Sequence, residues 1–142
     1  MTHVRHLLAS KPATLFSIAP DAPVLEAVRA MAEHGVGALL VLSAGTLAGI
    51  VSERDYARKV VLRGRASADT PVAQIMSSPV LTVTPETTVQ QCMVLMTERR
   101  IRHLPVVDGG RVIGVVSIGD LVKSLIEEQR RTIEQLESYI HG

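Results

Sequence analysis

The chain repeats itself once at a spacing of 65 residues, and the two copies align without a gap from Ser17 to Asp55. Within these 39 positions, 11 residues are identical, and most other pairs keep their apolar or polar character. A repeat of this length that occurs only twice is too long for a solenoid unit and too short for two ordinary domains. The sequence therefore predicts one domain built from two equivalent halves, with any site between the halves present in two copies.

The repeat divides the chain into four segments. We expect repeat 1 over residues 1–64, a polar linker over 65–71, repeat 2 over 72–125 and a helical tail over 126–142. The first residues contain no acidic side chain and faintly resemble a transit peptide. However, the segment from Val4 to Leu8 resembles the segment from Val72 to Met76, so we expect it to belong to the fold.

Within each half, the apolar spacing predicts the order strand, helix, strand, strand, helix, which is an α/β fold. The first half is expected to form a helix between Asp21 and His34 that ends at Gly35. The other elements expected are strands at 38–42 and 48–51 with a helix at 56–62, then in the second half a helix at 89–96, strands at 104–107 and 112–116, and a helix from residue 120.

Composition excludes several classes of function. A net charge of +1 and only three aromatic residues disfavour nucleic-acid binding. The single cysteine, Cys92, cannot form an internal disulfide and is consistent with a reducing compartment. The longest apolar runs, such as 38–42, are too short to span a bilayer. We therefore expect a cytoplasmic protein without membrane contact.

The tail continues as a helix from Leu121 to Ile140 with one apolar face and one charged face. Two interpretations are open: the helix packs on its own domain, or its apolar face meets a partner subunit. The apolar face consists of Val122, Ile126, Ile133, Leu136 and Ile140.

Both halves contain a strand that runs into Ser-x-x-Asp at the start of a helix, at Ser52–Asp55 and at Ser117–Asp120. This spacing is a capping box, in which the serine and the acid satisfy backbone groups of the helix. The same helix start also directs free N–H groups toward an anion, and an Asp beside it can accept hydrogen bonds from a ribose diol. Capping and nucleotide binding are compatible roles.

At these residues the sequence resembles the cystathionine-β-synthase (CBS) domain pair, also called a Bateman module, over about residues 4–125. The phrases Ser52–Arg58 and Arg102–Val106 look like those of small stand-alone bacterial members. The resemblance implies a regulatory protein that binds AMP, ADP, ATP, S-adenosylmethionine or NAD in clefts between the halves and needs no metal. It also implies a homodimer through the CBS helices. From the apolar face of the tail, we expect the C-terminal helix to touch the other subunit. The regulated protein is unidentified and is expected to be a separate chain, unless the protein works only as a nucleotide reservoir.

The resemblance also transfers site residues. Asp55 and Asp120 match the ribose-binding acid, and Ser52 and Ser117 match the neighbouring hydroxyl position. The other nucleotide-binding candidates are the strand-entry residues Val36, Gly37, Ala38, Ile101, Arg102, His103, Leu104 and Pro105, together with Gly119 and the phosphate candidates Lys11, Arg54 and Arg58. Because only the second half carries the basic pair Arg102 and His103, we expect the two sites to differ in phosphate binding.

Two other functions stay open: a nucleotide-processing enzyme built around Arg102, His103 and Asp120, and a purely structural dimerisation module. No Ser, Cys or acid is placed by the sequence as a nucleophile for His103, so we expect no catalytic residues. His3 and His6 lack the further ligands of a zinc site, and Cys92 is expected to be a buried small hydrophobe.

Overall fold

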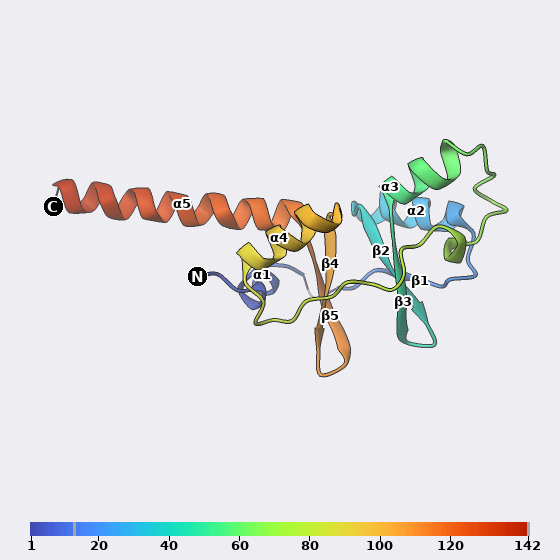
Figure 1. Cartoon of the computed structure of the whole chain (residues 1–142), viewed down its shortest axis with the longest axis horizontal. Coiled ribbons are helices and arrows are strands. Elements are labelled where there is room, and N and C mark those ends of the chain that lie inside the picture. The colour runs from blue at the N-terminus through green and yellow to red at the C-terminus, as the bar shows by residue number, and fades with distance from the viewer. Residues whose placement is uncertain (13, 142) are drawn as a thin grey trace. The chain divides into compact units, whose positions relative to one another are not determined.

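The computed structural model describes residues 1–12 and 14–141 and contains two compact units (Figure 1). Unit 1 combines residues 1–14 with 82–142, and unit 2 consists of residues 15–81. The units differ from the sequence repeats, because the first residues of the chain join the second repeat. The expected boundaries at 64, 71 and 125 divide the sequence and stay a prediction. Gly142, the last residue of the expected tail, lies outside the described residues.

Unit 2 holds a three-stranded sheet in the order β1-β2-β3. β1 pairs parallel to β2, and β2 pairs antiparallel to β3. Its elements are β1 (Ser17–Ile18), α2 (Val24–His34), β2 (Ala38–Ser43), β3 (Thr46–Ser52), α3 (Glu53–Tyr56), a π-helix over Ala57–Val61 and a 3-10 helix over Val72–Gln74. The predicted helix at 56–62 therefore begins earlier, at Glu53, because Ser52 caps it.

Unit 1 is built on the antiparallel hairpin of β4 and β5. Its elements are α1 (Val4–Ala9), α4 (Val89–Arg99), β4 (His103–Asp108), β5 (Arg111–Ser117) and α5 (Ile118–His141). The N-terminal segment belongs to the fold, as predicted, because Val4 and Leu7 of α1 are buried. Among the described residues, no helix has both the length and the apolar character needed to cross a membrane.

The strand predicted to open the second repeat is reduced to one parallel bridge between Val83 and Val106. In unit 2, the N–H of Leu40 donates to the carbonyl of Phe16 and extends β1. The equivalent of Leu40 in the second repeat is Pro105, which has no N–H to donate. The proline thus removes one ladder hydrogen bond, and the strand that opens the second repeat is shorter than β1.

The two units bury equivalent aliphatic residues, which gives each its own core. Cys92 is fully buried at the position that Ala27 occupies in unit 2, so the expectation of a small buried hydrophobe is confirmed. Burial raises the pKa of its thiol. Other equivalent buried pairs are Val24 with Val89, Met31 with Met96, Leu39 with Leu104, Val41 with Val106, Val51 with Val116 and Val72 with Val4.

The hairpin turns explain why the repeat preserves glycine where it does. Both central residues of each two-residue turn have positive φ, as the right-handed twist of the strands requires. Gly109 and Gly110 fill this turn in unit 1, whereas Ala44 and Gly45 fill it in unit 2. The left-handed end of α2 likewise falls on Gly35, as predicted, and that of α4 on Arg100.

Two glycines at equivalent positions of the repeat, Gly49 and Gly114, mark places where two segments of the chain come close together. A Cβ on Gly49 of β3 would lie 2.6 Å from Sδ of Met76 and 2.9 Å from the carbonyl oxygen of Ser77. A Cβ on Gly114 of β5 would lie 2.5 Å from Cδ2 of Leu8. The strand that leads into each Ser-x-x-Asp box is therefore in direct contact with a second chain segment, which is residues 76–77 in unit 2 and Leu8 in unit 1.

We expect Gly49→Ala to destabilise the protein by about 1–3 kcal/mol, because the backbone carbonyl of Ser77 must move. Gly114→Ala should cost less, because only the flexible end of Leu8 must give way. Urea unfolding measures both, and Gly119→Ala is the control, since its Cβ would be 3.6 Å from Oγ of Ser117. A Gly49→Ala protein as stable as the wild type would contradict the close approach.

Candidate functional site

Each Ser-x-x-Asp motif forms the predicted capping box at the junction of a strand and a helix. In unit 2, the N–H of Asp55 donates to Oγ of Ser52 at 3.2 Å, and the N–H and Oγ of Ser52 both donate to Oδ2 of Asp55 at 3.0 Å. In unit 1, the N–H of Asp120 donates to Oγ of Ser117 at 3.2 Å, and the N–H of Ser117 donates to Oδ2 of Asp120 at 2.8 Å. These reciprocal bonds hold each carboxylate at the first turn of its helix.

The strand-entry residues lie beside this box in both units, as the sequence predicts. Ala38 pairs with Ser52 across β2 and β3, and His103 pairs with Ser117 across β4 and β5. The carbonyls that precede them accept the first N–H of each helix: Gly37 accepts from Glu53 at 3.0 Å, and Arg102 accepts from Ile118 at 2.9 Å. The strand entry and the acidic box therefore form one continuous edge in each unit.

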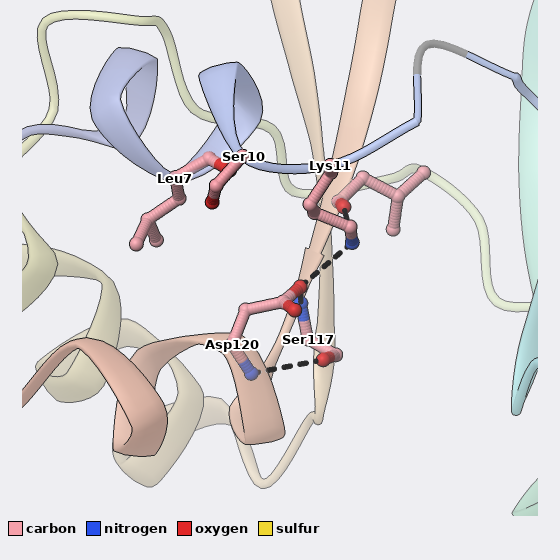
Figure 2. Close-up of polar contacts among 6 residues, drawn as sticks. Leu7, Ser10, Lys11, Ser117 and Asp120 are labelled. Atoms are coloured by element: carbon pink, nitrogen blue, oxygen red, sulfur yellow. Dashed lines mark hydrogen bonds and ion pairs between the residues drawn. The ribbon is translucent and has the colours of Figure 1, made fainter. Parts of the chain in front are cut away.

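A lysine holds each carboxylate, but the two lysines come from different places in the chain. In unit 1, Nζ of Lys11 lies 2.7 Å from Oδ2 of Asp120 and donates to the carbonyl of Val115 at 2.8 Å (Figure 2). In unit 2, Nζ of Lys59 lies 3.1 Å from Oδ1 of Asp55 and donates to the carbonyl of Ile75 at 2.8 Å.

The different lysines leave the two carboxylates with different free acceptors. Both oxygens of Asp55 are engaged, Oδ2 by Ser52 and Oδ1 by Lys59. In unit 1, Oδ2 of Asp120 accepts from Ser117 and Lys11, and Oδ1 accepts no hydrogen bond among the described residues. Asp120 therefore offers one oxygen to a ligand without giving up an existing partner.

The pKa values in unit 1 follow from this arrangement. Burial acts to raise the pKa of Asp120, but hydrogen bonds from Lys11 and Ser117 outweigh it, and the net pKa is lowered. Burial lowers the pKa of His103, and the positive charges of Lys11 and Arg102 add to this effect against the opposing charge of Asp120. His103 is therefore neutral at pH 7, while Asp120 is ionised.

A cavity of about 570 Å³ lies in unit 1 between α1 and the first half of α5. Lys11 and Asp120 line it together with His6, Ser10, Glu127 and Arg131. The ion pair thus borders open space rather than a closed core. A polar ligand can reach the carboxylate from this side without repacking of the unit.

The remaining predicted residues fall into groups of different exposure. Arg102, Arg58 and Gly119 are exposed, and Arg54, Val36 and Ile101 are half-buried. Leu104 and Pro105 are buried in the strand and contribute to the core of unit 1.

Sequence reasoning missed Lys59 as a partner of Asp55. The signal that could have found it is the four-residue spacing from Asp55, which places the two side chains on one face of a helix. Lys11 was predicted as a phosphate contact, and the structure places it on Asp120 instead of in isolation. That pairing joins residues 109 positions apart, which no local pattern reveals.

The two N-terminal histidines lie together without forming a metal site. The N–H of His3 donates to Nδ1 of His6 at 3.0 Å, and the ring centroids are 5.7 Å apart. Across residues 1–12 and 14–141, no group of three or more His, Cys, Asp or Glu side chains is arranged to hold a metal ion.

Comparison with known proteins defines the family. The CBS domain model matches residues 4–62 and again 72–127, so the chain belongs to the CBS domain family and carries the domain as a tandem pair, a regulatory module. Protein CBSX3, a mitochondrial CBS-domain protein of Arabidopsis thaliana, is 47% identical over 127 residues, with 86% of this chain and 62% of that protein covered. The chain thus spans less than two thirds of that relative.

Solved structures share the fold. A CBS-domain protein of Burkholderia ambifaria is 51% identical with a TM-score of 0.87, over 90% of this chain and 96% of that one. The CBS domain pair of protein MJ0100, solved with 5′-methylthioadenosine and S-adenosyl-L-methionine, is 25% identical with a TM-score of 0.79, over 90% and 98%. The hexameric CBS-CP12 protein of bloom-forming cyanobacteria is 28% identical with a TM-score of 0.77, over 86% and 70%.

We expect Lys11→Met to destabilise the protein at pH 7 by about 1 kcal/mol, a reduced value because the pair is partly exposed. The pKa of Asp120 is lowered only in the folded state. The stabilisation by the ion pair is therefore complete above the unfolded pKa of about 3.9, and it is lost as the pH falls through the lower pKa of the folded state. Urea unfolding at pH 7 and in acid measures the difference from the wild type, which should narrow in acid.

The matched control is Arg5→Met, which removes the exposed pair of Arg5 and Glu86 and should change little. In the Lys11→Met protein, carbon-detected NMR should also show a raised pKa of Asp120. An unchanged pKa of Asp120 would show that Lys11 does not hold the carboxylate in solution.

Proposed function

We propose that this protein is a non-catalytic sensor that binds an adenine nucleotide (AMP, ADP, ATP or NAD) at the Ser-x-x-Asp boxes and modulates a separate partner protein. The observation that supports it most is the duplication of the whole edge: a strand entry, a capped helix start and a fixed carboxylate recur in both units. The adenosine ligands of the MJ0100 domain pair agree with this ligand class.

The chemistry of the edge suits a nucleoside better than a bare anion. A carboxylate accepts from donors, and the 2′ and 3′ hydroxyls of ribose are adjacent donors. The helix N-terminus favours negative charge, so a phosphate group is suited to the N–H groups beyond the serine. The carboxylate and the helix start thus suit the two polar ends of one nucleotide.

Unit 1 is the better candidate for a highly phosphorylated ligand. Arg102 is exposed at the strand entry, and His103 follows it, whereas unit 2 has Gly37 and Ala38 at these positions. His103 is neutral without a ligand because its pKa is lowered. A nearby phosphate would favour its protonated form, so binding of a polyphosphate should take up a proton.

A ligand regulates only if it binds two arrangements of the protein with different affinities. The module has no catalytic role in this proposal. Nucleotide binding changes its conformation or its oligomeric state, and a partner protein recognises that change. The hexamer of the CBS-CP12 relative supports self-association as such a readout. For this chain we propose a homodimer formed through the CBS helices and α5, in the cytoplasm.

Calorimetry with AMP, ADP, ATP and NAD tests the ligand class, with the guanosine analogues as controls. We expect heat from at least one adenine ligand, and a loss of about tenfold or more in affinity for Asp120→Asn or Asp55→Asn. Asparagine keeps a carbonyl oxygen for the serine N–H, so the cap and the fold are preserved. No binding of any adenine ligand by the wild type would refute the sensor proposal.

The double variant Arg102→Ala, His103→Ala tests the phosphate role. It should weaken ATP binding by about tenfold or more and adenosine binding little, since charge-assisted contacts to phosphate are lost. The affinity of the wild type for ATP should rise from pH 8 to pH 6 more than that of His103→Ala. Equal losses for ATP and adenosine would contradict the phosphate role, and ATP hydrolysis lost in His103→Ala would instead identify an enzyme.

A further inference from the structure

The second half of α5 extends away from the rest of unit 1 (Figure 1). Every residue from Gln129 to His141 is exposed, and the last apolar residues reach 58% exposure at Leu136 and 74% at Ile140. A helical segment of this length is only marginally stable in water without a packed face. The exposed apolar residues therefore require a cover.

The spacing of these residues is that of a coiled coil. Val122, Ile126, Gln129, Ile133, Leu136 and Ile140 follow one another at alternating intervals of four and three residues. Such a 3.5-residue repeat makes a straight seam when two helices supercoil around each other. We call these six residues the α5 seam.

The seam is separate from the face with which α5 packs on its own unit. The buried residues of α5 are Leu121 and Ser124, and neither belongs to the seam. Val122 and Ile126 of the seam remain 42% and 51% exposed although they lie beside this contact. The whole seam, from its first residue to its last, is thus open to a second helix.

Charges beside the seam distinguish the two orientations of such a pair. In the heptad, Lys123, Arg130 and Glu137 flank one side of the seam, and Leu125, Thr132 and Tyr139 flank the other. In a parallel pair, opposite sides meet and no oppositely charged pair forms. In an antiparallel pair, like sides meet in reverse order.

The antiparallel register that fills the seam places Val122 against Ile140 and Ile126 against Leu136 of the second helix. It also places Lys123 against Glu137 twice and the apolar Leu125 against Tyr139 twice. It places Gln129 against Ile133 twice, and one like-charged pair, Arg130 with its own copy, forms near the centre. The antiparallel register thus forms two ion pairs between the helices, and the parallel arrangement forms none.

We infer that α5 pairs with α5 of a second copy of this chain as an antiparallel two-helix coiled coil, in which Lys123 of each copy meets Glu137 of the other. This inference rests on the proposed self-association and adds its geometry. In this arrangement α5 determines with which helix the chain pairs, because its charge pattern favours another α5 in the reverse orientation.

The test is a mixing experiment with two full-length charge-reversal variants, Lys123→Glu and Glu137→Lys. Each variant alone places like charges at both outer pairs and should weaken dimerisation by about tenfold in sedimentation equilibrium. A mixture of the two should form a heterodimer with wild-type affinity, since both pairs become oppositely charged again. Glu134→Lys, with the same charge change away from the seam, is the control and should dimerise as the wild type.

Failure to recover affinity on mixing would overturn the antiparallel pairing. A disulfide between two copies of Ile140→Cys under mild oxidation would also overturn it, because only a parallel pair brings these positions together. The wild type with buried Cys92 serves as the background for this experiment. Truncation after Lys123 should yield a monomer or a weaker dimer, and an unchanged dimer would show that α5 is not the interface.

These outcomes are distinguishable from failure of the nucleotide proposal. Calorimetry on the full-length Glu137→Lys variant measures ligand binding with the coiled coil weakened, since Asp120 and the rest of unit 1 are retained. Loss of the coiled coil with intact nucleotide binding would refute only this inference.

Discussion

The reciprocal hydrogen bonds between Ser and Asp at the start of α3 and α5 are the interaction on which the site depends. They end a strand and begin a helix within one residue, because the serine satisfies an orphan N–H of the helix and the acid satisfies the N–H of the serine. The same bonds immobilise a carboxylate beside the strand entry. A structural cap thereby becomes a preorganised acceptor for a ligand at no further conformational cost.

The two units share this box but differ in the lysine that neutralises its carboxylate. Lys59 reaches Asp55 from the π-helix that follows α3, whereas Lys11 reaches Asp120 from the N-terminal segment. The alignment of Val4 with Val72 places Pro79 opposite Lys11, and the repeat places Ser124 opposite Lys59. Each unit therefore neutralises one half-buried acid with a lysine from a different place in the chain, and Oδ1 of Asp120 accepts no hydrogen bond among the described residues.

The sequence predicted the parts of the fold that depend on local chemistry. The repeat, the caps at Ser52 and Ser117, the end of α2 at Gly35 and the two hairpins follow from residues adjacent in the chain. The features missed depend on distant partners: the missing ladder bond at Pro105, the ion pair of Lys11, and the joining of the first residues to the second repeat. The loss of one N–H group and a contact between distant residues do not change the spacing of apolar residues, so the sequence pattern does not reveal them.

The central claim is that the capping boxes are also ligand sites, and the amide groups within them report it most directly. Titration of ¹⁵N-labelled protein with AMP, followed by two-dimensional NMR, monitors the N–H of Ser52 and of Ser117, each of which donates to the carboxylate of its box. The account predicts saturable shifts of at least one of these resonances with AMP or, in matched titrations, with ADP, ATP or NAD, and none with GMP. Resonances of both boxes that stay fixed at millimolar concentrations of all four adenine ligands would contradict it.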